Sequence, residues 1–263
     1  MFQVSERFKR LQKSNMIFQL VANGGDNQGL FRAAIGDSAS LSAVPRYNES
    51  YVEGIYTQFA GFAYVLSFSG ASIVLTSNGN SGCADKGTST LSCLRAANSS
   101  TIALAGSQVL AARKATIYAF APMIDDDFLR TRPVEAFFAG SFAKVPVIFG
   151  SNTNEGAGWS TGISDPAANT NTAGANATTV YNFFKGQYGS ITFDSINKAM
   201  DPAQLNLYPL ASYSSVTAQT QQMYGEERYI CPAGMIVGAA RKAGITAAYQ
   251  YQSVNQIITH VRS

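Results

Sequence analysis

Glu155 is the residue best placed to do chemistry in this sequence. It follows an apolar run at 145–150, which predicts a buried strand, and it lies in a polar loop among small residues. In open α/β sheets, functional side chains lie on the loops beyond the carboxyl ends of the strands. A carboxylate there suits the acid of a Ser-His-Glu triad, which orients the histidine that activates a serine.

The two other members of such a triad are harder to place. No Gly-x-Ser-x-Gly turn occurs in the sequence, so we assign no nucleophile. Residues 36–40 come closest, but Ser40 replaces the second glycine, and we expect Ser38 to be a core or turn hydroxyl. His260 is the single histidine and therefore the one candidate base.

The elements that must position these residues follow from periodicity and turn residues. The patterns predict helices at 15–22, 48–62, 88–97, 101–113, 133–138 and 232–242, and strands at 32–37, 116–121, 145–150 and 246–252. Interleaved helices and strands indicate an α/β fold. The Ser/Ala/Asn/Thr/Gly-rich stretch at 164–179 predicts an exposed surface loop.

Composition excludes several classes of function. Of the 263 residues, 46% are hydrophobic and 13% charged, which favours a substantial core over disorder. The net charge of +3 comes without a Lys/Arg run, so we expect no nucleic-acid partner. One histidine and scattered acids give no metal-ligand spacing, and there is no phosphate loop, so we expect no metal or cofactor.

Two features bear on the compartment. The apolar segment 59–76 could just span a bilayer, but serines and glycines dilute it and no basic clusters flank it, so we do not expect a membrane span. The apolar run at 16–22 is interrupted by Gln19, and we predict no signal peptide in this chain.

Three cysteines allow one bridge with one thiol left over. Cys83 and Cys93 are close enough for a short bridged loop, whereas we expect Cys231, before Pro232, to be buried and inert. The sequence also carries three glycosylation sequons, which begin at Asn48, Asn98 and Asn176. The sequons and the cysteine pair together suit an oxidising compartment.

Several longer segments carry a family resemblance. They are 23–35, 83–95, 125–133, 142–147, 152–156 and 224–232. Together they resemble the type-B carboxylesterase/lipase family, in particular its secreted fungal members. The resemblance implies a partial α/β-hydrolase fold, with a mostly parallel sheet flanked by helices, that lacks the N-terminal strands and the nucleophile elbow.

The resemblance also implies roles for single residues. Glu155 matches the triad acid, Cys83 and Cys93 match a family disulfide, and the acidic triplet at 125–127 becomes a structural turn. His260 lacks the glycine of the family's Gly-x-x-His pattern, so it departs from the expected base. Residues 64–81 have no counterpart and are predicted to be an insertion within a single partial domain over 1–263.

The functional expectation is a portion of a carboxylic-ester hydrolase, secreted by resemblance. The family acts on small-molecule ester or lipid substrates through a Ser-His-Glu mechanism. Without a nucleophile or an oxyanion loop, we expect this chain to be inactive alone. The alternative is a non-catalytic, cholinesterase-like binding or adhesion module, as some relatives of the family are.

Overall fold

Three parallel strands form the sheet that carries the predicted acid. The computed structural model describes residues 15–41, 44–63, 83 and 89–253. The strands are β1 (Ala34–Asp37), β2 (Val147–Asn152) and β3 (Ala248–Ser253), in the order β1-β2-β3. Both pairings are parallel, which confirms the predicted mostly parallel α/β architecture and places β2 at the centre.

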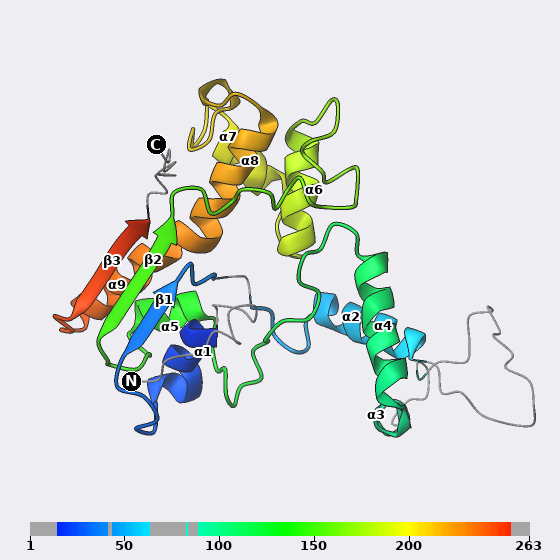
Figure 1. Cartoon of the computed structure of the whole chain (residues 1–263), viewed down its shortest axis with the longest axis horizontal. Coiled ribbons are helices and arrows are strands. Elements are labelled where there is room, and N and C mark those ends of the chain that lie inside the picture. Colours follow the sequence, from blue (N-terminus) through cyan, green and yellow to red (C-terminus); the bar gives the residue numbers. More distant parts are fainter. Residues whose placement is uncertain (1–14, 42–43, 64–82, 84–88, 254–263) are drawn as a thin grey trace, which may run out of the picture.

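Helices make up most of the remaining regular structure (Figure 1). They are α1 (Asn15–Val21), α2 (Ser50–Phe62), α3 (Thr90–Ala96), α4 (Ser99–Ala112), α5 (Pro133–Ala139), α6 (Ala177–Gln187), α7 (Phe193–Met200), α8 (Val216–Gly225) and α9 (Cys231–Lys242). Short turns η2 (Ala22–Gly25) and η4 (Leu210–Ser212) are 3-10 helices, and η5 (Glu226–Ile230) is a π-helix that joins α8 to α9 without a break.

One face of the sheet packs on helices α1, α5 and α9 (Figure 1). Phe149 of β2 is fully buried in this core, and Gly36 on β1 leaves room for its ring. On the opposite face Ile35, Ile148 and Tyr249 lie side by side in register and remain exposed. The core on the helix side therefore holds β2, and hence the start of the Glu155 turn, in place.

A second core lies beyond the carboxyl ends of the strands. Helices α6, α7 and α8 pack around the buried rings of Phe183, Phe184 and Tyr224. The stretch 164–176 is a loop with many exposed positions, although Ala168 and Thr170 are buried in or beside this core. The loop ends at 176, where Asn176 caps α6 with its side chain.

Helices α2 and α4 pack against each other in a third region, to which the disulfide belongs. Cys83 and Cys93 are bridged, as the family resemblance implies. Cys231 is a free thiol, but it is exposed rather than buried. It lies at the start of α9, on a side of the helix away from the face that packs on the sheet through Ile236 and Ala240.

The predicted strand at 116–121 is absent from the structure. The backbone N–H of Ile117 donates to the Gln187 side chain at 3.1 Å, so this segment pairs with a helix side chain rather than with a strand. Its alternating apolar residues instead serve two cores, since Ile117 faces the α6 cluster and Ala119 the α2–α4 cluster. The nearest ladder contact is an isolated bridge between Arg46 and Ile124.

Two predictions concern residues that the structure does not describe. The predicted insertion at 64–81 and most of the apolar segment 59–76 lie outside the described residues, and 59–62 belong to the end of α2. In the part of the chain that is described, no helix combines the length and the apolarity needed to cross a bilayer.

Candidate active site

Glu155 lies three residues beyond the end of β2, in the turn that the sequence predicts for it. Its Oε1 accepts a hydrogen bond from the backbone N–H of Asn152 at 2.6 Å and a weaker one from the Asn152 side-chain amide at 3.3 Å. No hydrogen bond from a described residue reaches Oε2. The half-buried carboxylate is thus held through one oxygen and can accept a hydrogen bond through the other.

Helix α8 fixes the turn by direct backbone contact. A Cβ on Gly156 would lie 1.7 Å from the carbonyl oxygen of Gln221, and one on Gly225 would lie 2.8 Å from the Gly156 nitrogen. The indole N–H of Trp159 donates to the carbonyl oxygen of Glu155 at 2.9 Å, and the Trp159 ring packs on Tyr224 with centroids 6.1 Å apart. Glycines therefore let the helix approach, and the tryptophan closes the turn.

Strand β3 ends directly beside this turn. Asn152 is in register with Ser253, and the carbonyl oxygen of Ser253 accepts hydrogen bonds from the N–H and hydroxyl of Thr153 at 3.2 and 3.1 Å. The sequence continues from here to His260, which lies outside the described residues. Its role as the candidate base therefore stays a prediction.

Ser38 lies at the end of β1 and behaves as a structural hydroxyl. It is 5% exposed, and its Oγ accepts the Asn152 side-chain amide at 3.1 Å. Asn152 thereby links Ser38 to Glu155 across two neighbouring strands. A serine that holds the acid's neighbour in this way fits the predicted turn hydroxyl better than a nucleophile.

The π-helix η5 presents an unusual set of polar groups next to the turn. The hydroxyl of Tyr188 donates to Glu227, and the guanidinium of Arg228 lies over the rings of Tyr118, Tyr224 and Tyr229 at 5.1 to 5.8 Å. Desolvation raises the pKa of the Glu227 carboxyl group to about 7, and the Tyr188 hydrogen bond and the Arg228 charge oppose this shift. Solvent still reaches the Glu227 side chain. Desolvation likewise raises the pKa of Tyr188 well above its usual value.

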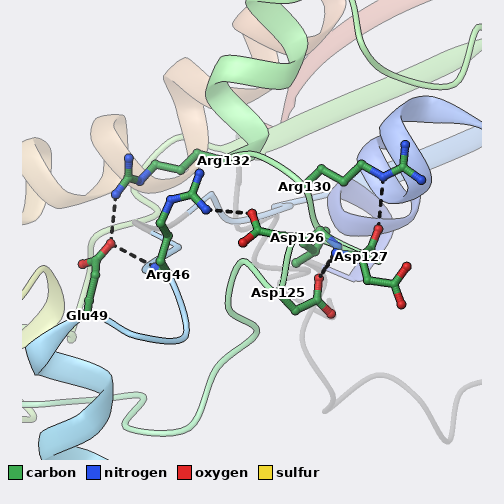
Figure 2. A network of polar contacts seen from close by, with 8 residues as sticks. Arg46, Glu49, Asp125, Asp126, Asp127, Arg130 and Arg132 are labelled. Carbon is green, nitrogen blue, oxygen red and sulfur yellow. Dashed lines mark hydrogen bonds and ion pairs between the residues drawn. The ribbon is translucent and has the colours of Figure 1, made fainter.

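The acidic triplet at 125–127 is a structural turn (Figure 2). Asp125 accepts the backbone N–H of Leu129 at 2.8 Å, which lowers the pKa of its carboxyl group. Asp126 pairs with Arg46 at 2.7 Å on the surface. Among the described residues no cluster of three His, Cys, Asp or Glu side chains could hold a metal ion.

The three sequon asparagines are exposed. Asn98 and Asn176 are also the N-caps of α4 and α6, and in both the side-chain oxygen accepts backbone N–H groups of the first turn. Capping uses Oδ1 and a glycan would attach to Nδ2, so the two roles are compatible.

Sequence reasoning missed the residues that hold the acid. Asn152 could have been found, because an Asn three residues before a loop carboxylate is a common local hydrogen-bond partner. Trp159 gave no such signal. Sequence reasoning also missed the neighbouring pair Tyr188 and Glu227, which are 39 residues apart. Their contact depends on how the end of α6 packs on η5, which local patterns do not encode.

Comparison with known proteins places this chain in a family. The carboxylesterase family model matches residues 19–260. The solved structure of EstA from Aspergillus niger aligns with 91% of this chain and 41% of its own, at 21% identity and a TM-score of 0.66. A solved PNB esterase aligns with 92% of this chain and 41% of its own, at 17% identity and a TM-score of 0.56. A search of curated proteins found no match.

The two solved structures show a likeness in fold, and the chain spans about two fifths of their length. The family model extends over most of the sequence, including β2, which precedes the Glu155 turn, and β3, which ends beside it. The chain therefore belongs to the carboxylesterase family.

Proposed function

We propose that this chain is the acid-bearing portion of a carboxylic-ester hydrolase, with Glu155 as the acid of a Ser-His-Glu triad. The observation that carries the proposal is the carboxylate held by Asn152 at the carboxyl end of the central strand, directly beside the end of β3. In this role Glu155 would orient a histidine and stabilise its protonated form. The substrates would be small-molecule esters or lipids, as the family implies.

The serine and the oxyanion groups are not supplied by any motif in this sequence. We therefore expect the chain to be inactive alone, with His260 as the one base candidate that it contains. The sequons, the disulfide and the fungal neighbour support a secreted glycoprotein. The alternative proposal, a binding or adhesion module without catalysis, is favoured by the same missing nucleophile.

Two experiments test the proposal. The purified chain should neither hydrolyse short-chain aryl esters nor react with a fluorophosphonate probe. Residues 16–253 should then replace the matching portion of a complete, active carboxylesterase. In that chimera Glu155→Gln should reduce kcat about 10⁴-fold, as for other triad acids, while Glu155→Asp retains part of the activity.

Glu135→Gln is the matched control, because Glu135 lies on the surface, paired with Arg132. It should leave the chimera's kcat unchanged. Equal activity of the Glu155→Gln and Glu135→Gln chimeras would refute the assignment of Glu155 and favour the non-catalytic alternative.

A further inference from the structure

A cavity of about 330 Å³ lies between α2 and the segment at 118–123, with Arg228 in its wall. Glu155 is not among the residues that line it. The lining is largely apolar, and Tyr118, Phe120 and Met123 remain exposed to solvent. The volume falls in the range of small-molecule sites, which are mostly apolar with a few placed polar groups.

Arg228 is the one charged side chain among the described residues of this wall. It is 7% exposed, forms no salt bridge with any described residue, and its Nε has no hydrogen-bond partner there. A guanidinium cannot lose its proton in a protein, and a buried donor without an acceptor is costly. The tyrosine rings beneath it supply cation–π contacts, and the charge of Glu227 and the hydroxyls of Tyr188 and Tyr229 also interact with the guanidinium, but no described group accepts a hydrogen bond from Nε.

The one amide side chain among the described lining residues is already engaged. Gln187 uses its side chain to hold Ala115 and Ile117 of the adjacent segment. Tyr51 lies under the guanidinium of Arg113, which is itself bonded to Gln58. Arg228 is thus the one charged group in a mostly apolar cavity, and its Nε is a buried donor without a partner among the described residues. A neighbouring hollow shares the wall from Ala121 to Met123.

We propose that this cavity binds a monocarboxylate with an apolar chain, whose carboxylate pairs with Arg228 and whose chain fills the apolar space. Arg and carboxylate form charge-assisted, often bidentate hydrogen bonds, which would satisfy the unpaired donor. The volume, equal to that of about 11 water molecules at ~30 Å³ each, suits a medium-length chain. Binding of this kind does not depend on ester hydrolysis.

The test uses the full chain and three probes that share one alkyl chain: octanoate, 1-octanol and octylamine. Trp159 reports binding by fluorescence, because its ring lies 6.1 Å from that of Tyr118 in the cavity wall. Octanoate should bind saturably, at least about tenfold more tightly than octanol, and octylamine should bind more weakly than either. Calorimetry should give the same order.

Variants then locate the site. Arg228→Met should abolish the preference for octanoate over octanol, whereas Arg113→Met, which removes an arginine just outside the lining, should keep it. Val52→Phe should weaken both ligands by filling the cavity from α2 without touching the charge. Near-UV circular dichroism checks that each variant is folded.

The probe comparison on the unaltered chain decides the proposal even if Arg228→Met does not fold. Equal affinity for octanoate and octanol, or no saturable binding of octanoate, would overturn it. A preference for octanoate that persists in folded Arg228→Met, or binding unaffected by Val52→Phe, would do the same.

Discussion

Replacing Gly156 with alanine should destabilise the fold through one contact. The added Cβ would lie 1.7 Å from the Gln221 carbonyl oxygen and 2.6 Å from its carbon, where real Cβ contacts stay above 3.0 Å. The turn and α8 must then separate by at least 3.0 − 1.7 = 1.3 Å. Gly156 has no positive φ, so the backbone of an alanine is not itself strained.

The magnitude follows from what blocks the new methyl group. A flexible side chain could rotate away, but here the obstacle is helix backbone, which can only move together with its packed neighbours. Overpacking in well-packed regions costs about 1–3 kcal/mol, and we expect the upper end. For a protein of this size that corresponds to a Tm lower by roughly 6–12 °C.

The matched control is Gly238→Ala on α9. A Cβ there meets nothing within 4 Å, and the residue is helical and exposed. The same chemical change should raise stability by about 0.8–1 kcal/mol through helix propensity. Thermal melts followed by far-UV circular dichroism, with Trp159 fluorescence for the turn, measure both variants.

The test is that Gly156→Ala should lower the stability whereas Gly238→Ala should raise it. If Gly156→Ala melts within 2 °C of the unaltered chain while Gly238→Ala behaves as expected, α8 does not approach the turn as closely as described, and the argument for a rigidly held Glu155 fails.

Three further predictions concern other parts of the molecule. Glu227 has a folded-state pKa raised to about 7 from 4.5, so its stabilising neutral form is complete below pH 4.5 and is lost as the pH rises through 7. The free energy of unfolding should therefore fall between pH 5 and pH 8, as measured by urea unfolding. Because solvent reaches the side chain, Glu227→Gln should make this fall smaller by only about 1 kcal/mol. Replacing both Cys83 and Cys93 with serine should lower the free energy of unfolding by roughly 2–3 kcal/mol, and non-reducing peptide mapping that paired either with another cysteine would contradict the bridge. Deleting 64–81 should preserve a cooperative melt, and loss of that transition would make the segment part of the core.

The elements that could be predicted have strong local signals. The helix at 133–139 begins with Pro133 and ends before Gly140, whose φ of 73° is the left-handed conformation that glycine favours. The strand before Glu155 is an uninterrupted apolar run, as expected for a central parallel strand. The position of Glu155 followed from this strand and the family resemblance.

The missed features depend on tertiary packing. The alternation at 116–121 is typical of a strand, but nothing in it specifies whether a strand or a helix side chain will be its neighbour. The polar composition of 164–179 likewise did not reveal that Ala168 would be buried. The contacts that hold the acid join residues from β1, β2 and α8, and no single stretch of sequence contains them.

The π-helix η5 has a mechanical consequence for the molecule. Helices α8 and α9 form one rod through it, with Met223 and Tyr224 turned into the second core and Ile236 and Ala240 turned onto the sheet. Each residue in a helix advances the side chains by about 100° around the axis, and a π turn absorbs one extra residue. Losing a single residue from η5 would twist one apolar stripe by that angle against the other.

The orientation of the α8 side chains in the second core and that of the α9 side chains on the sheet are therefore fixed relative to each other. Loops elsewhere in the chain can change length without altering which side chains are buried. Along this rod a change of one residue would expose one stripe or the other. Natural variants should accordingly conserve the number of residues between Tyr224 and Ile236 even where their identities drift.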